Sequence, residues 1–163
     1  MKITVYVVGV VVIAAFMAIG GTGAQKRPAL SKQTEDNLST AMHGEALAYA
    51  KYMLYAQHAR NNGKKQLAAL FERAARTERF QHFAEEADLA GLVGSDEDNL
   101  RDAIQGESYE VETMYREFAQ LAAAAGDKSA ADRFEEIRHD EMGHRDAFKA
   151  ALAKPEIKSV KSH

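Results

Sequence analysis

The sequence predicts an all-α protein, a four-helix bundle made of two related helical hairpins. Ala, Leu, Glu, Lys and Arg dominate the chain, and only two of its 163 residues are proline, a composition that favours helices. Apolar residues recur every three or four positions in four long segments, the period of a helix with one buried face. The last two segments also repeat features of the first two in the same order.

Two helical patterns that meet at a glycine predict the first hairpin. The first pattern runs from about residue 35 to 61, and Asn61-Asn62-Gly63 ends it with residues that tolerate a left-handed backbone. The second runs from about residue 64 to 89 and keeps its apolar positions on one stripe. Gly91–Ser95 then breaks the pattern, and Ser95 followed by acidic residues is typical of a helix N-cap.

The second hairpin follows directly. Its first helix is predicted from about residue 97 to 124, Gly126 stops it, and the last helix reaches about residue 153. The bundle is therefore expected over residues 34–153, with a polar lead at 25–33 and a polar tail at 154–163.

Matching residues relate the two hairpins. The pairs are Gly44-Glu45 with Gly106-Glu107, Gly63 with Gly126, Phe71 with Phe134, and Glu78 with Glu141. At a rise of ~1.5 Å per residue, Glu45 lies ~27 Å before the turn at Gly63 and Glu78 lies ~22 Å after it. In the second hairpin, Glu107 lies ~28 Å before Gly126 and Glu141 lies ~22 Å after it. Four glutamates from four helices can therefore converge in the middle of a bundle.

The N-terminus is apolar from Ile3 to Ile19, follows Lys2, and leads into the small residues Gly20 to Ala24. This pattern predicts a secretory signal peptide over residues 1–24, and hence an exported, periplasmic protein. The alternative is a membrane anchor through residues 3–19, because the run is close to the minimum of ~17 residues for a membrane span.

The composition of the chain excludes several kinds of partner and functional site. The formal net charge is −3 and no basic stripe is present, so the sequence does not indicate a nucleic-acid partner. The chain has no cysteine, which excludes thiolate zinc sites, iron–sulfur clusters and a thiol nucleophile. Any metal ion must be held by carboxylate and imidazole groups.

Inward-facing carboxylates indicate such a metal site. Glu107 and Glu110 are three residues apart and share the face of their helix that should be buried. Buried carboxylates are costly unless a positive group neutralises them, and no Lys or Arg stands at a matching position. Glu110 has no counterpart in the first hairpin, where Ala48 stands at the equivalent place.

A bundle that binds two metal ions supplies one Glu from each of two helices and a Glu-x-x-His from each of the others. Glu141-Met142-Gly143-His144 fits this pattern, and Glu78-Arg79-Phe80-Gln81-His82 is one residue too long. Each feature alone is more often a solvated surface group, but their order and matched heights predict a dinuclear site. The candidate ligands are Glu45, Glu78, His82, Glu107, Glu110, Glu141 and His144. Tyr49, one turn from Glu45, is either a hydrogen-bond donor to a ligand or a packing residue.

From about Leu30 to Leu152 the chain resembles the rubrerythrin branch of the ferritin-like superfamily. The segments that carry the resemblance are His43-Gly44-Glu45, Leu70-Phe71 with Glu78, Asp98-Asn99-Leu100, Gly106-Glu107-Ser108-Tyr109-Glu110-Val111-Glu112 with Met114-Tyr115, and Phe134 with Glu141 and His144. The resemblance implies a non-haem di-iron centre that reduces hydrogen peroxide or dioxygen. It also implies that Glu45, Glu78, Glu107, Glu110, Glu141 and His144 are iron ligands.

The sequence departs from the family pattern in its second helix. One extra residue separates Glu78 from His82, so Gln81 stands where a histidine is expected when counted from Phe71. A π-bulge can absorb one inserted residue, and residues four apart also share a helix face. His82 is therefore favoured as the ligand, and Gln81 is the alternative.

Two more departures concern electrons and location. The family usually carries a rubredoxin-like iron–thiolate domain, whereas this chain has no cysteine and resembles the stand-alone bundle forms. Its electrons would come from an external donor protein or a small reductant. The family is usually cytoplasmic, whereas the apolar N-terminus favours export.

The function expected from this resemblance is peroxide reduction at a di-iron centre, with Glu110 as the movable, catalytic ligand. The alternatives are a ferroxidase that handles iron, or a non-catalytic bundle that binds zinc or manganese. The five residues Gly91–Ser95 span at most ~18 Å, which is too short for a crossover of more than ~30 Å along a bundle. We therefore expect a domain-swapped homodimer, with an up-down-up-down monomer as the alternative.

Overall fold

A computed structural model of the chain describes residues 29–154, and these residues form helices without any strand. The first hairpin consists of α1 (Lys32–Asn61) and a continuous second helix made of α2 (Lys65–Thr77), the π-helical segment η1 (Glu78–Phe83) and α3 (Ala84–Ala90). The second consists of α4 (Asp96–Tyr109), the π-helical segment η2 (Glu110–Met114), α5 (Tyr115–Ala125) and α6 (Lys128–Leu152). The predicted all-α class and its two hairpins are confirmed, with boundaries within about three residues of those expected.

The predictions for the signal peptide or anchor lie outside the described residues. Within residues 29–154, no helix is both long and apolar enough to cross a membrane.

Local signals in the sequence set the helix ends. The Ser31 hydroxyl accepts a hydrogen bond from the backbone N–H of Thr34 at 3.2 Å and so caps α1. Ser95 caps α4 in the same way at 3.1 Å. The turn at the tip of the second hairpin requires a glycine, because Gly126 has a φ of 86°.

Small residues hold the first hairpin together. Ala56 and Ala59 of α1 and Ala68 and Ala75 of α2 are at most 2% exposed, so the two helices approach closely. Each hairpin also has a matched aromatic triad, which consists of Tyr52, Tyr55 and Phe71 in the first and Tyr115, Phe118 and Phe134 in the second. The duplication predicted from the sequence is therefore repeated in the packing.

The π-helical segments lie where the repeat changes register. Glu107 follows Glu45 by 62 residues, but Gly126 follows Gly63 by 63, so the second hairpin has gained one residue between these points. That extra residue is absorbed in η2. His144 follows His82 by 62 residues, and the extra residue of the first hairpin lies in η1. Of the two ways to accommodate the extra residue before His82, a π-bulge or plain i,i+4 spacing, the structure has the π-bulge, and the π-helical segment that begins at Glu110 was not predicted.

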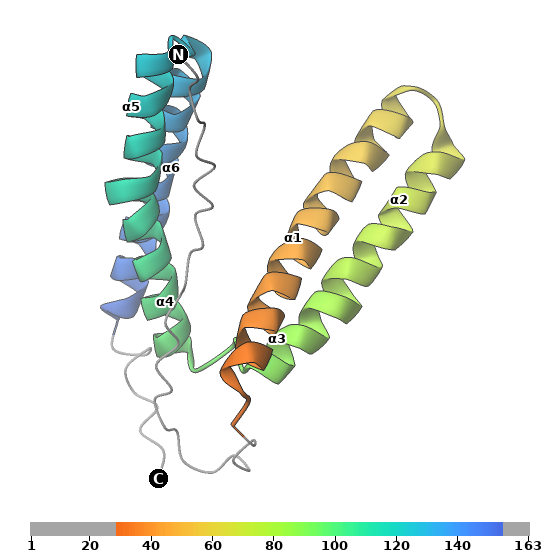
Figure 1. The fold of residues 1–163 in the computed structure, drawn as a ribbon, viewed down its shortest axis with the longest axis horizontal. Helices are drawn as coiled ribbons and strands as arrows, with labels where there is room; N and C mark the ends of the chain where they lie inside the picture. Colours follow the sequence, from red (N-terminus) through yellow and green to blue (C-terminus); the bar gives the residue numbers. More distant parts are fainter. Residues whose placement is uncertain (1–28, 155–163) are drawn as a thin grey trace, which may run out of the picture.

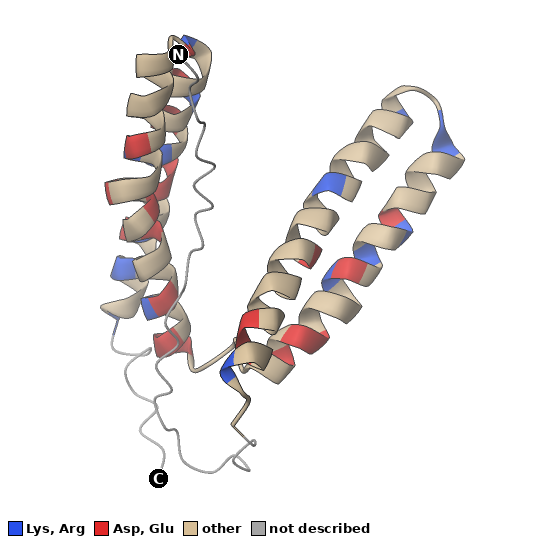
Figure 2. Cartoon of the chain, in the orientation of Figure 1, with Lys and Arg blue, Asp and Glu red and all other residues tan. Residues whose placement is uncertain are grey.

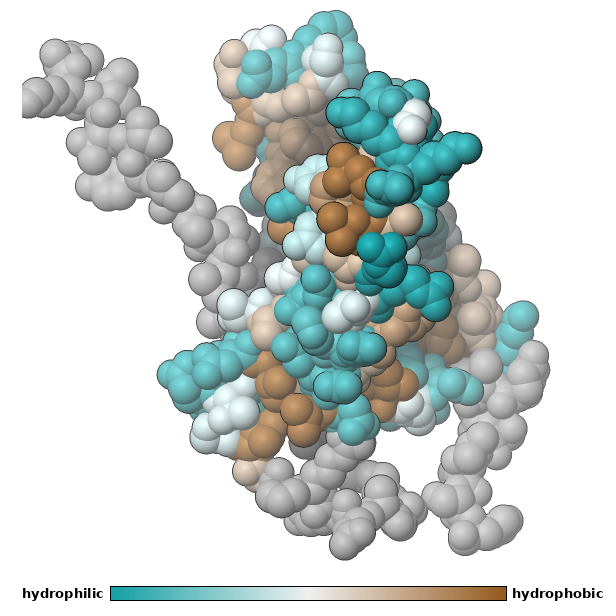
Figure 3. All heavy atoms as spheres, turned by 90° about the vertical axis from the view of Figure 1, so that its right-hand side faces the viewer, coloured by the Kyte–Doolittle hydropathy of each residue, from teal (hydrophilic) through white to brown (hydrophobic). Residues whose placement is uncertain are grey.

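The two hairpins diverge from the linker at Gly91–Ser95 (Figure 1). No element of the first hairpin has a Cα within 8 Å of a Cα in an element of the second, over the described residues. Large apolar side chains consequently stay exposed, including Leu54 at 69% and Leu121 at 68%. On the face formed by the first hairpin, such side chains interrupt an otherwise hydrophilic surface (Figure 3).

Candidate metal centre

The first hairpin brings together two carboxylates and one imidazole. Glu45 projects from α1, whereas Glu78 and His82 project from η1 across the hairpin. The His82 Nδ1 lies 2.8 Å from the Glu78 Oε2 and 3.7 Å from the Glu45 Oε2. One ligand atom from each of the three lies within 4.8 Å of the others. We call these three residues the first half-site.

The π-helical segment places His82, and not Gln81, in this half-site. Glu78 is the first residue of η1 and has a side chain that is only 16% exposed, while the His82 side chain is 49% exposed. The extra residue between them widens the turn and leaves both side chains facing α1. The imidazole is therefore accessible at the rim of a pair of more buried carboxylates.

The second hairpin builds a matching group from Glu107 of α4 and Glu141 and His144 of α6. The His144 Nδ1 lies 2.6 Å from the Glu141 Oε2 and 4.0 Å from the Glu107 Oε1. Again one ligand atom from each residue lies within 4.8 Å of the others. We call these three residues the second half-site, which repeats the two-carboxylate, one-imidazole composition of the first.

Within each half-site, the two carboxylates lie close to each other. Burial raises the pKa of Glu45 above its ordinary value of 4.5, and the neighbouring Glu78 carboxylate raises it further. Burial and the adjacent Glu141 raise the pKa of Glu107 in the same way. The hydrogen bond to Glu141 raises the pKa of His144 above 6.5. In each half-site, two carboxylates therefore carry more negative charge than the single histidine can neutralise.

Glu110 lies beside the second half-site but outside its group of three. It is the first residue of η2, and burial followed by the charge of Glu141 raises its pKa. Glu110 in turn faces Tyr115, whose pKa is raised by burial and then by Glu110, Glu141 and Glu107. The first hairpin offers no carboxylate at the position equivalent to Glu110, which is Ala48.

Tyr115 is the residue near the carboxylates that the sequence analysis did not single out. Its signal was the spacing of the repeat, because it corresponds to Tyr52 in the first hairpin and follows Glu110 by five residues. Tyr49 is engaged elsewhere: its hydroxyl accepts a hydrogen bond from the Arg79 Nη1 at 3.3 Å. The Arg79 guanidinium also lies 5.4 Å from the centre of the Tyr49 ring. The Tyr49 hydroxyl donates no hydrogen bond to a candidate ligand within the described residues, so the structure shows it in the packing role.

The four glutamates do not converge within one chain. The first and second half-sites stand on different hairpins, and no helical element of one hairpin comes within 8 Å of the other, Cα to Cα, over the described residues. Figure 2 shows acidic residues along both hairpins and on either side of the open angle between them. A dinuclear centre that uses both half-sites therefore requires hairpins brought together by closure or by a second chain.

The donor atoms fit first-row metal ions. Carboxylate oxygen and imidazole nitrogen are the ligands that non-haem iron, manganese and zinc accept in proteins. The Glu107 Oε2 is buried and has no hydrogen-bond partner among the described residues. Such an oxygen is costly unless a proton or a cation satisfies it. A metal ion would satisfy this oxygen and offset the crowded charge at the same time.

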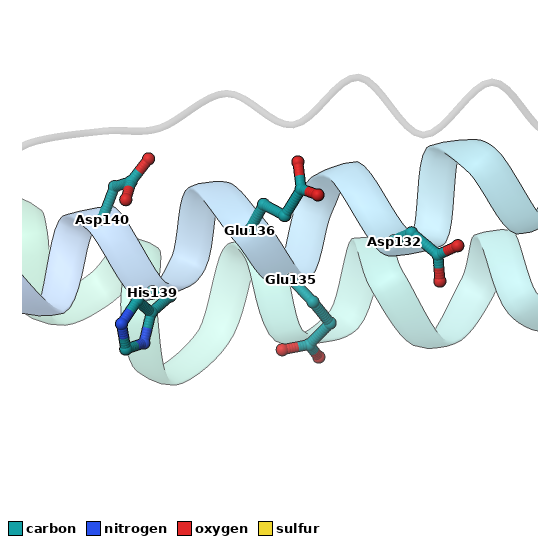
Figure 4. Close-up of a pocket in the computed structure, with 5 residues that line it drawn as sticks. All are labelled: Asp132, Glu135, Glu136, His139 and Asp140. Carbon is teal, nitrogen blue, oxygen red and sulfur yellow. The ribbon is translucent and has the colours of Figure 1, made fainter.

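A separate acidic surface on α6 does not share these properties (Figure 4). It is formed by Asp132, Glu135, Glu136, His139 and Asp140. Glu136 and Asp140 project to one side of the helix, and Glu135 and His139 project to the other (Figure 4). The groups that could hold a metal ion in the described part of the chain are the two half-sites alone.

Comparison with known proteins agrees with this geometry. The Rubrerythrin family model matches residues 36–152. The chain is 35% identical to a rubrerythrin from Porphyromonas gingivalis over 78% of this chain and 70% of that protein. It is 31% identical to a putative rubrerythrin from Methanocaldococcus jannaschii over 79% of this chain and 74% of that protein.

A solved structure of nigerythrin in a mixed-valence state is also similar. It has 30% sequence identity and a TM-score of 0.38, over 86% of this chain and 74% of that one. The family match spans all four helices and both half-sites, and the fold class is the ferritin-like four-helix type. The chain therefore belongs to the rubrerythrin family of di-iron proteins.

Proposed function

We propose that this protein reduces hydrogen peroxide at a di-iron centre formed by its two half-sites. The reaction takes one hydrogen peroxide, two electrons and two protons and gives two water molecules. Two iron ions, when bound, would supply the two electrons by passing from the ferrous to the ferric state. The observation that carries the proposal is the pair of matched Glu₂His half-sites in a chain of the rubrerythrin family.

Two side chains beside the second half-site, Glu110 and Tyr115, are suited to handle the protons. Burial raises the pKa of Glu110, so a Glu110 carboxylate that is not bound to metal can hold a proton closer to neutral pH than an ordinary carboxyl. Tyr115 keeps its phenolic proton, because burial and the surrounding carboxylates raise its pKa above 10.0. Glu110 stands outside the compact group of three, so we assign it the role of the movable ligand that opens a position for peroxide.

We also propose that the working unit is a domain-swapped homodimer. The first hairpin of one chain would pack against the second hairpin of its partner and join their half-sites into two centres. The five-residue linker favours this arrangement over a crossover within one chain. The exposed apolar residues Leu54 and Leu121 also need a covering surface.

Charge favours pairing between unlike hairpins. Residues 32–90 contain eight basic and eight acidic side chains, whereas residues 96–154 contain eight basic and 15 acidic ones. Two copies of the second hairpin would therefore repel each other, and the neutral first hairpin is the better partner. The apolar run Ile3–Ile19 adds the proposal that this dimer is exported, or is anchored to a membrane by that run.

The reaction is tested by anaerobic single turnover. The iron-loaded protein is reduced, excess reductant is removed, and hydrogen peroxide or dioxygen is added in separate experiments. Rapid reoxidation with one peroxide consumed per two ferrous ions supports the proposal. Preference for dioxygen with accumulation of ferric iron would identify an iron-handling ferroxidase instead. A protein that binds zinc or manganese but no iron, and a Glu107→Ala variant that behaves like the wild type, would contradict both.

Subunit complementation tests the dimer. Glu45→Ala disables the first half-site, and Glu107→Ala disables the second, so neither variant alone should assemble a complete centre. In a swapped dimer that contains one chain of each, the intact hairpins meet and rebuild one of the two centres. Random mixing during co-refolding should then restore about a quarter of the wild-type centres, since half of the dimers are mixed. Absence of any restored metal binding in a confirmed mixed dimer would refute the swap.

A further inference from the structure

A part-buried carboxylate that is not among the predicted ligands lies in the helix that follows the first half-site. Glu86 stands in the first turn of α3, four residues after His82. Its Oε2 is buried and has no hydrogen-bond partner among the described residues. The one other side-chain atom of residues 29–154 in this condition is the Glu107 Oε2, which belongs to the second half-site. Each hairpin thus holds one unsatisfied carboxylate oxygen at its cluster of ligands.

The position of Glu86 on its helix favours approach to the first half-site. The Cα–Cβ bonds of a helix tilt toward its N-terminus, and residues four apart share a face, so a side chain at position 86 is expected to extend back toward His82. The α3 helix that carries Glu86 packs against α1, the helix that carries Glu45. Glu85, the next residue in the chain, is exposed to solvent. The burial of the Glu86 Oε2 therefore depends on the position of Glu86 on the helix, and its acidic neighbour Glu85 does not share it.

We propose that Glu86 is a further metal-binding carboxylate of the first half-site, an inference that rests on the proposed di-iron function. Its ligand atoms lie outside the compact group of three, as do those of Glu110 in the second half-site. A change of side-chain rotamer would bring it to an ion held by Glu45, Glu78 and His82. Each half-site then consists of two core carboxylates, one histidine and one outlying carboxylate.

In the sequence repeat, the outlying carboxylate stands at a different position in each hairpin. Glu110 has Ala48 as its counterpart in the first hairpin, and Glu86 has Phe148 as its counterpart in the second. The two outlying carboxylates therefore come from non-equivalent helices and approach the centre from different directions. Together with the four core glutamates they give six carboxylates for the two proposed ions.

Cobalt(II) titration of the metal-free protein tests this assignment, since its visible absorption reports the number and type of ligands. We expect wild-type protein and the matched control Glu85→Gln to bind two equivalents per pair of half-sites. Glu86→Gln should bind one equivalent about 10- to 100-fold more weakly, with altered absorption for that equivalent alone. Equal affinities and spectra for Glu86→Gln and the wild type would overturn the proposal. If the wild type bound no cobalt or iron at all, the di-iron function itself would fail.

Stability without metal separates a ligand from a purely structural group. Glu86→Gln removes an unpaired buried charge, so the metal-free variant should unfold at a denaturant concentration equal to or higher than that of the wild type. A structural role predicts the opposite, namely an unfolding midpoint that falls in the presence of a chelator while cobalt binding stays the same. That result would also overturn the proposal.

Discussion

Glu107→Gln should stabilise the metal-free protein and weaken the metal-loaded one. In the metal-free state, the Glu107 Oε2 is buried without a hydrogen-bond partner, and the carboxylate lies against Glu141. A buried unsatisfied group costs about 1–3 kcal/mol, and the low end applies here because the side chain is 20% exposed. The amide of glutamine removes the charge and can donate a hydrogen bond to Glu141. We therefore expect a gain of about 1 kcal/mol, which corresponds to a rise of about 4 °C in Tm.

When metal is bound, Glu107→Gln should lower the stability of the protein. Loss of a ligand carboxylate should weaken binding of the affected ion at least about tenfold, which is ~1.4 kcal/mol. Calorimetry in chelator, and then with ferrous or manganous ion under anaerobic conditions, measures both effects on one protein. Glu117→Gln, on the exposed part of α5, is the control and should change neither Tm. If metal-free Glu107→Gln melted below the wild type and metal addition left that gap unchanged, Glu107 would be a structural residue and the reasoning would fail.

Four further outcomes are expected. His82→Ala should lose one metal equivalent in an equilibrium titration while Gln81→Ala keeps both, and the reverse result would assign the ligand to Gln81. The free energy of unfolding without metal should fall as pH rises from about 5 to 8, as measured by urea unfolding in chelator. Folding raises the pKa of Glu107 above 4.5, so the folded state loses stability when this carboxyl ionises. Folding also raises the pKa of His144, so the charged pair of His144 with Glu141 is lost when His144 gives up its proton. Metal affinity should rise over the same pH range, because protons compete for the ligands. Glu110→Ala should retain two metal ions but reduce peroxide about 10- to 100-fold more slowly, and stopped-flow reoxidation at the wild-type rate would exclude Glu110 as the movable ligand.

Local patterns in the sequence were sufficient to predict the helices and the composition of each half-site. Hairpin turns at Gly63 and Gly126 and the cap at Ser95 follow from backbone chemistry that depends on a few neighbouring residues. The pairing of Glu45 with Glu78 follows from equal distances to one turn, which needs only the helical rise. These features are short in range, so sequence spacing determines them.

Other features depend on contacts that spacing does not encode. Glu86 looks like one member of an acidic stretch, and only packing against the first helix makes it differ from Glu85. The π-helical segment at Glu110 was visible as a one-residue change in the repeat, but its position within the helix depends on which turn opens most easily. The angle between the hairpins has no close backbone contact to define it within the described residues, so sequence spacing offers no constraint on it.

The ligand faces have a requirement that the packing within a hairpin does not have. The first hairpin is held by closely packed alanines such as Ala56 and Ala75, which all come from that hairpin. The ligand faces, in contrast, carry excess negative charge on both hairpins and would repel each other on closure. In the dimer that we propose, two divalent cations would turn that repulsion into attraction where Glu45 and Glu107 meet. We therefore expect metal binding and the joining of hairpins to be coupled, with each half-site as one side of an interface that the metal ions complete.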